Sequence, residues 1–378
     1  MAAAIEVGRE QWLGYRWQGH GFGDRDAVLD DLLLLGFQDS RQSGAEQSQR
    51  QRTGKAPARG LVSMWSVRGA PHTHRASHLD FVRDALAPRD CDEGGAAYVE
   101  AVDEVAAALT KVVTSPTTKS DASSEVTQIV AKSLVTWCER CGADHVPDGL
   151  FRDAGRQAQL VLGDDSRTTM LKPTPKASQV TIDNPRLTLL TTFFRVNGPT
   201  SKTLFRDWVG GSTAGVAQEW GQLEDVVKVQ VDNKRLDLPE RLVDDVTNAP
   251  RAEGVVLVPP NDAYLRQVDR TLLVSDSKLR QQVWKAVSGP GALLIDGEVA
   301  GVCRYRRNDQ TLTIAPFQGR CSASHRCRGE RSARSRCCRR GADSRLGLSM
   351  LVCARKLSRC VRTHDCPIDS VRRFRSTR

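Results

Sequence analysis

The chain has 378 residues and a formal net charge of +10, because 55 Lys and Arg stand against 45 Asp and Glu. No stretch approaches the roughly 18 consecutive apolar residues that a membrane span requires, and residues 1–10 lack the basic start and apolar core of a secretory signal. The four cysteines of residues 1–318 are scattered and indicate no disulfide framework, so we expect a cytoplasmic protein.

Charge and cysteine are both concentrated at the C-terminal end. Residues 319–378 carry 17 Lys and Arg against four Asp and Glu, a net charge of +13, which leaves −3 for residues 1–318. Seven of the 11 cysteines lie in the same segment, and its apolar residues show no period. We expect a disordered basic tail. It is either an out-of-frame translation of the gene, which we favour, or an arm that grips DNA phosphates.

The first 95 residues predict helices, a polar segment and a short strand. Apolar residues recur at helical spacing from Trp12 to Leu35 and stop at Gly36. The polar stretch up to Gly60 is rich in Gln and Arg and predicts a mobile loop or a weak hairpin. A strand with a turn at Gly69 and a helix from Leu79 complete this part.

Residues 96–182 begin with the clearest helix of the chain. Apolar residues from Tyr98 to Val112 form a single stripe, and a shorter helix follows before Leu134. Next comes a Cys-x-x-Cys-x-x-x-His sequence, formed by Cys138, Cys141 and His145. Two thiolates and an imidazole make it a weak candidate for a structural zinc site, but no fourth ligand is evident nearby. The alternative is a pair of reduced thiols without metal.

Residues 185–239 show the order of a winged helix, which is a helix-turn-helix followed by a β-hairpin. Three short helices are separated by Gly198-Pro199 and Gly210-Gly211, and alternating Val and polar residues from Val227 to Val231 predict a strand that turns and returns. The surface of the third helix includes Gln218 and Gln222 but no Lys or Arg. Its alternative role is therefore that of a scaffold rather than of a reader of bases.

Residues 251–318 are rich in predicted strands. Val255–Val258 is a short apolar strand, and residues 293–302 predict a hairpin around Asp296-Gly297. A further pair of strands is expected around residues 304–314, with a turn between them.

Four motifs occur in a fixed order along residues 10–317. They are Leu35-Gly36-Phe37-Gln38-Asp39, the run from Trp65 to His72, the run from Pro259 to Leu265, and the hairpin from Leu294 to Gly301. In this order they resemble the winged-helix DNA-binding proteins common in actinobacteria, which are related to the AlkZ/YcaQ-type DNA glycosylases.

The resemblance implies an α+β fold in which tandem winged-helix domains and a C-terminal β-rich subdomain enclose a groove for DNA. The expected units are residues 1–95, 96–182 and 183–250, the β-rich subdomain 251–318, and the tail 319–378.

The resemblance also implies candidates for catalysis. In glycosylase members a Gln-apolar-Gln or Gln-apolar-Asp motif aligns the water that cleaves the bond between sugar and alkylated base. Here Gln38 takes the first position, Asp39 follows it directly, and Ser40 stands at the third position. We expect Gln38 to orient the water and Asp39 to stabilise the developing sugar cation.

Several further side chains are candidates for contacts with DNA. The basic residues after Asp39 could hold phosphates beside the reactive centre, or they could belong to a solvated loop. Those near the last hairpin could contact a backbone or a minor groove, or could serve solubility alone. The expected contacts are Arg50, Arg52, Lys55, Arg59, Arg68, His72, Gln218, Gln222, Arg304, Arg306 and Arg307.

These observations lead to three hypotheses. The first is a monomeric DNA-binding protein that grips the backbone of double-stranded DNA without a cofactor. The second is a DNA glycosylase that takes an alkylated purine out of the stack and hydrolyses its N-glycosidic bond. The third is a damaged family member with no stable fold.

Overall fold

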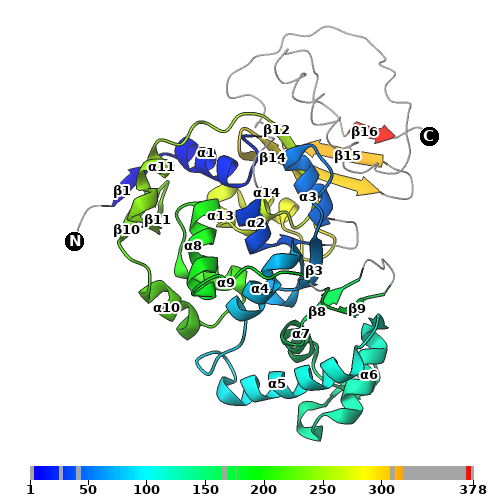
Figure 1. Cartoon of the computed structure of the whole chain (residues 1–378). Coiled ribbons are helices and arrows are strands. Elements are labelled where there is room, and N and C mark those ends of the chain that lie inside the picture. The colour runs from blue at the N-terminus through cyan, green and yellow to red at the C-terminus, as the bar shows by residue number, and fades with distance from the viewer. Residues whose placement is uncertain are drawn as a thin grey trace.

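The fold is α+β, as predicted, and consists of a main lobe and a smaller helical lobe (Figure 1). The tandem winged-helix arrangement remains a prediction. The computed structural model describes residues 4–24, 29–39, 44–163, 168–175, 177–306 and 311–317, together with the backbone of residues 372–375.

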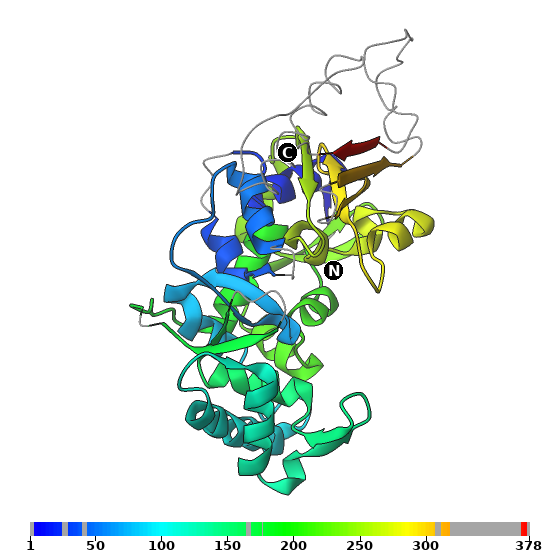
Figure 2. The ribbon, with the colours of Figure 1, turned by 90° about the vertical axis from the view of Figure 1, so that its right-hand side faces the viewer.

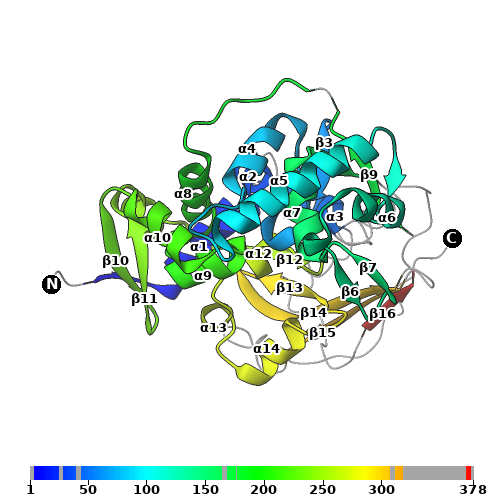
Figure 3. The same cartoon turned by 90° about the horizontal axis from the view of Figure 1, so that it is seen from below.

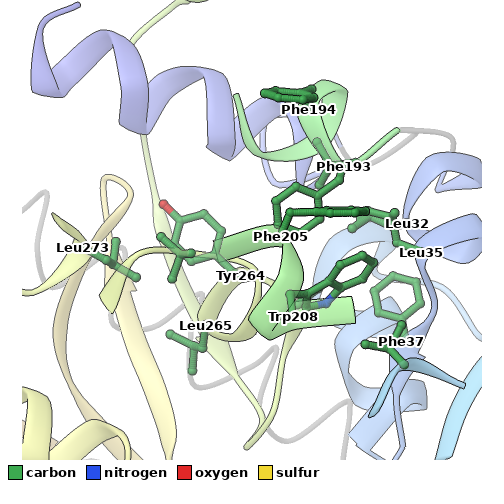
Figure 4. Packing of buried hydrophobic residues seen from close by; sticks show 14 of the residues in the cluster. Leu32, Leu35, Phe37, Phe193, Phe194, Phe205, Trp208, Tyr264, Leu265 and Leu273 are labelled. Carbon is green, nitrogen blue, oxygen red and sulfur yellow. The ribbon is translucent and has the colours of Figure 1, made fainter. Parts of the chain in front are cut away.

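The main lobe draws its core from segments that are far apart in the sequence. One hydrophobic cluster joins side chains from residues 7–86 to others from residues 189–317 (Figure 4). With Val161 included, all four expected units of residues 1–318 therefore contribute to a single core. Its helices are α1 (Arg9–Gly19), α2 (Asp30–Leu35), α3 (Gly44–Thr53), α4 (Leu79–Ala85), α8 (Pro185–Asn197), α9 (Lys202–Val209), α10 (Thr213–Gly221), α11 (Val243–Thr247), α12 (Ala263–Arg266), α13 (Arg270–Leu273) and α14 (Ser277–Val283).

The helical lobe lies below the main lobe in Figures 1 and 2. It contains α5 (Gly95–Val112), α6 (Lys119–Ile129) and α7 (Asp148–Gln157), packed around a second hydrophobic cluster. The apolar stripe predicted from Tyr98 to Val112 is the buried side of α5, whose Val102, Val105 and Leu109 are fully buried. A short hairpin, β6 (Thr136–Cys138) and β7 (Ala143–His145), belongs to this lobe (Figure 3).

Three sheets connect the helices. The first has the order β2 (Phe37–Gln38), β4 (Pro71–Arg75), β3 (Leu61–Trp65), β8 (Leu160–Leu162), β9 (Met170–Pro173) and β5 (Thr117–Thr118), so it runs between the lobes. The second has the order β12 (Val255–Val258), β13 (Gly291–Ile295), β14 (Glu298–Arg306), β15 (Thr311–Pro316) and β16 (Arg372–Arg375). The third has the order β1 (Ile5–Val7), β10 (Val226–Val231) and β11 (Lys234–Pro239).

The predicted elements of residues 185–239 are present. Helices α8, α9 and α10 are followed by the hairpin β10–β11, and Ser201 and Ser212 cap the second and third helices through their hydroxyl groups. The predicted strand Val255–Val258 and the hairpin around Asp296-Gly297 are also confirmed. The backbone of residues 372–375 pairs with β15, and the disorder expected of the tail stays a prediction. The rest of the tail and the turn at residues 307–310 lie outside the described residues.

The prediction of a loop or hairpin before Gly60 is wrong, because residues 44–53 form α3. The buried side of this helix is polar and includes Gln47, Ser48, Gln51 and Arg52. A search for apolar periodicity cannot find such a helix. Its burial depends on hydrogen bonds in the core rather than on apolar contact.

Arg52 provides most of those hydrogen bonds. Its guanidinium forms a bidentate ion pair with Asp262, at 2.9 Å for both contacts, and neither side chain is exposed. It also donates to the carbonyl oxygens of His20 (2.7 Å) and Ser48 (2.8 Å). Asp262 in turn caps α12 through the N–H of Tyr264. One side chain thus ties α1 and α3 to α12.

Replacement of Arg52 by methionine should lower the free energy of unfolding by about 3–5 kcal/mol, because it leaves the Asp262 charge buried without its partner. Replacement of the exposed Arg59 by alanine is the matched control and should change stability by less than about 0.5 kcal/mol. Urea denaturation followed by circular dichroism measures both. Equal midpoints for the two variants would contradict a structural role of this ion pair.

Candidate nucleic-acid interface

A hollow of about 930 Å³ lies between the loop before α12, the helices α12 and α14, and the strand β14. Among the described residues that line it there is no Asp or Glu. A cavity wall of one sign concentrates the field and attracts anions. We call it the cationic hollow, because the positively charged residues in its lining are Arg266, Arg270, Lys285, Arg304 and Arg306.

Two of these arginines have no carboxylate partner among the described residues. Arg270 stacks over the ring of Trp284 at 5.5 Å, and Arg266 keeps its Nε buried without a hydrogen bond. Burial lowers the pKa of Arg266, and the positive charge of Arg270 lowers it further. The two guanidinium groups therefore repel each other in the free protein, and a bound anion would relieve that repulsion.

The Gln38 segment lies on the edge strand of the sheet that runs between the lobes. Gly36 precedes it with φ of +86°, and a Cβ there would lie only 2.4 Å from the imidazole of His74. Glycine is required at this position for both reasons. Phe37 then points into the main core (Figure 4), and Gln38 pairs with His72 on β4.

The side chain of Gln38 leaves a polar atom unsatisfied. Its Oε1 is buried and has no hydrogen-bond partner in the described structure, which costs free energy unless the group serves a ligand or a water. The neighbouring Asp39 is half-buried, and its backbone N–H donates to the carbonyl of Pro71 at 2.8 Å. The Asp39 carboxylate accepts a long contact from the N–H of Ala45, at 3.4 Å.

His72 lies opposite Gln38 on the neighbouring strand β4, and its imidazole is neutral. It is 3 % exposed, and its Nδ1–H donates to the carbonyl of Ala70 at 2.9 Å. Burial lowers the pKa of His72 to about 3, and the charges of His74, Arg68 and Arg266 act in the same direction. The prediction of a DNA contact at His72 is therefore wrong, because this side chain is buried and carries no charge near neutral pH.

Arg68 connects the Gln38 segment to the cationic hollow. It is exposed, with a backbone φ of +55°, and its Nη1 donates to the carbonyl of Trp208 at 2.7 Å. Burial of part of the side chain lowers its pKa to about 10, together with the charges of Arg266 and Arg270. The charges of Arg68 and Arg266 both act on His72, which pairs with Gln38, so these arginines and the buried Oε1 of Gln38 lie in the same region of the main lobe.

Comparison with known proteins shows the family of the chain. The profile of the family described as DNA glycosylase AlkZ-like matches residues 40–340. The chain belongs to the AlkZ-like DNA glycosylase family. Among solved structures, the DNA glycosylase AlkZ of Streptomyces sahachiroi is similar over 95% of this chain and 97% of its own, with a TM-score of 0.67 and 16% identity. That similarity shows a shared fold. The comparison with curated proteins gave no match.

Within this AlkZ-like protein, the basic residues predicted after Asp39 have different roles. Arg52 cannot hold phosphate, because it is buried in its ion pair with Asp262. Arg50 is half-buried and bonds to Glu46 on its own helix at 2.8 Å. Lys55 and Arg59 are exposed, as a phosphate contact requires.

The amides predicted on α10 are exposed but engaged within the protein. Gln222 accepts a hydrogen bond from Asn184 at 2.8 Å, and the Cys91 sulfur contacts the Gln218 oxygen at 3.6 Å. The start of α10 is also occupied, since the Ser212 hydroxyl contacts Asp92 at 2.5 Å. A contact between this helix and DNA remains a prediction.

The residues predicted near the last hairpin lie at the cationic hollow. Arg304 and Arg306 are exposed and line it, whereas Arg307 lies outside the described residues, as does Ser40. Sequence reasoning missed Arg266, Arg270 and Lys285. A signal was available for two of them, because Arg266 and Arg270 stand four residues apart directly after the Pro259–Leu265 motif.

The structure brings together the three side chains of the weak zinc candidate. Cys138, Cys141 and His145 lie together on the β6–β7 hairpin, and none of them lines the cationic hollow.

Among the described residues, no helix has the length and apolar character that crossing a bilayer requires.

The stability of this protein should fall as the pH drops below about 6.5. Burial lowers the pKa of His72 to about 3, that of His74 to about 4, and that of His20 well below its usual value. The unfolded chain therefore binds protons that the native protein excludes. Each group should remove up to about 1.4 kcal/mol of stability for every pH unit below 6.5, until its native pKa is reached.

Urea denaturation at pH 7.5 and pH 5.5 measures this effect. The variant His74→Asn removes one of the three groups and should show a smaller loss between the two pH values than the wild type. The exposed variant Arg59→Ala should show the full loss. A free energy of unfolding that is constant over this range would contradict the neutral, buried state of these imidazoles.

Proposed function

We propose that the protein is a DNA glycosylase that hydrolyses the N-glycosidic bond of alkylated purines in double-stranded DNA. The observation that carries the proposal is the buried Oε1 of Gln38, which has no hydrogen-bond partner among the described residues and lies in the same region as Arg68 and Arg266. Membership in the AlkZ-like family supports the proposal. We therefore prefer the glycosylase hypothesis to the hypothesis of a protein that only binds DNA.

The chemistry demands little more than positioning and charge. Alkylation makes the purine cationic, so the bond between C1′ and the base nitrogen breaks with its electron pair moving to the base, which leaves as a neutral molecule. Gln38 accepts a hydrogen bond from a water molecule and orients it toward C1′. Water oxygen bonds to C1′ and its proton passes to the Asp39 carboxylate, whose charge has stabilised the oxocarbenium ion.

The cationic hollow serves the DNA backbone in this proposal. Arg266 and Arg270 have no carboxylate partner among the described residues, so a phosphate would pair with charges that are already in place. Arg304 and Arg306 reach the same hollow from β14. We further propose that α8–α10 and the hairpin β10–β11 form a winged helix that acts mainly as a scaffold, because residues 89–92 contact Ser212 before α10 and Glu219 near its end.

The catalytic assignment predicts that Gln38→Ala lowers the rate of base release by about 100-fold, because the water loses its fixed position. The assay incubates duplex DNA that carries an N7-alkylated purine with the full chain and counts abasic sites. Gln38→Glu keeps an acceptor oxygen and should retain more activity than Gln38→Ala. The matched control is Gln128→Ala, which removes an exposed glutamine of α6 and should have no effect.

Two outcomes distinguish a wrong assignment of residues from a wrong assignment of activity. Release that persists in the double variant Gln38→Ala with Asp39→Ala would overturn the residue assignment but leave the activity. Absence of release by the wild-type protein from every alkylated duplex tested would overturn the activity itself.

The DNA-binding assignment predicts a weaker salt dependence when the hollow loses charge. The double variant Arg304→Gln with Arg306→Gln should bind duplex DNA less tightly, and the slope of log K against log salt concentration should decrease in magnitude by about 2. Arg251→Gln is the control, since its side chain is 73% exposed and lies outside the hollow. Fluorescence anisotropy across a salt series measures both, and unchanged slopes would place the phosphates elsewhere.

A further inference from the structure

Three metal-binding side chains converge on the β6–β7 hairpin of the helical lobe. One donor atom from each of Cys138, Cys141 and His145 lies within 4.8 Å of the other two. The two cysteines lie at the end of β6 and in the turn, and the histidine ends β7 (Figure 3). This cluster plays no part in the proposed glycosylase chemistry.

The turn between the cysteines has the backbone of a metal-binding loop. The N–H groups of Cys141 and Gly142 both donate to the carbonyl of Cys138, at 3.2 and 2.8 Å. Gly142 has φ of +62° with open space around it, which lets the chain reverse directly after the second cysteine.

The orientation of His145 provides a second, independent observation. Its Nδ1–H donates to the carbonyl of Val146 at 2.8 Å, which leaves Nε2 with a free lone pair. That Nε2 is buried, has no hydrogen-bond partner of normal geometry among the described residues, and lies close to the Cys138 thiol. A histidine that ligates a metal is commonly held in this way, by a hydrogen bond from its other nitrogen to a backbone carbonyl.

We propose that Cys138, Cys141 and His145 bind a zinc ion. Two thiolates and an imidazole are ligands that zinc prefers, and a tetrahedral ion with Zn–S bonds of about 2.3 Å needs donors at such separations. No fourth His, Cys, Asp or Glu from the described residues joins the cluster. Water therefore completes the coordination in this proposal.

The hairpin's size supports a structural role for the ion. Each strand has only three residues, and Trp137 is 62% exposed, so little apolar surface is buried within the hairpin itself. Two-stranded ribbons of this kind are at best marginally stable alone. Directly after His145, the buried Val146 enters the core of the lobe. The ion would thus fix the hairpin where the chain turns toward α7.

Site-resolved alkylation of the full wild-type chain tests the proposal without any variant. The purified protein, loaded with zinc, is treated with a maleimide, and each modified cysteine is located by peptide mass spectrometry, with and without a chelator. Cys138 and Cys141 should be protected at least tenfold until the chelator removes the metal, although Cys141 is exposed. Cys91 is the internal control, and its rate should not respond to the chelator. Equal labelling of Cys141 with and without zinc would overturn the proposal.

Metal content provides the second measurement. Cys138→Ser should lose one zinc per chain relative to the wild type, whereas Cys91→Ser should lose none. The comparison with wild type is necessary because residues 319–378 contain seven further cysteines. His145→Cys keeps a ligand and should retain the ion. Unchanged zinc content in Cys138→Ser would contradict the site, and this result is independent of glycosylase activity.

Discussion

The main lobe depends on charged side chains that are buried and held by several hydrogen bonds each. Arg52 and Asp262 are both inaccessible to solvent, and their ion pair joins helices that are 210 residues apart in the sequence. Arg16 acts similarly, since it donates to Asn197 and to the carbonyls of Gln267 and Tyr264. A buried guanidinium tolerates few arrangements of its neighbours, because every lost contact leaves a charge in a medium that does not solvate it. These residues therefore fix how α1, α3, α8 and α12 meet.

The ion pair between Arg52 and Asp262 also helps to position the candidate catalytic and DNA-binding residues. The strand that carries Gln38 comes shortly before α3 in the sequence, and the guanidinium of Arg52 in α3 lies over the ring of Phe37 in that strand, at 5.2 Å. Arg266 follows Asp262 by four residues and faces the cationic hollow. One ion pair thus supports both the edge strand that carries Gln38 and the helix that presents Arg266. Buried arginines organise the fold, and unpaired arginines remain available for an anion.

Apolar periodicity in the sequence predicted much of the fold. It found α5, the order α8 to α10 with the hairpin β10–β11, and the strand pair around Asp296-Gly297, because each of these elements buries an apolar face. It missed α3, whose buried face is polar. Composition likewise could not distinguish Arg52 from Arg266. Both are arginines near carboxylates in the sequence, and only the tertiary structure shows which one has a partner.

The histidines near the site differ from the arginines in their response to pH. His72 and His74 are neutral because burial penalises their charged forms, so between pH 6 and pH 8 they add no charge to the region around Gln38. The positive charge of the cationic hollow comes chiefly from arginine, a residue type that stays charged in proteins. Attraction of phosphate should therefore be nearly constant over this pH range. The exclusion of protons from the buried imidazoles instead lowers the free energy of unfolding as the pH falls. Moderate acid would weaken the scaffold before it altered the charge of the hollow.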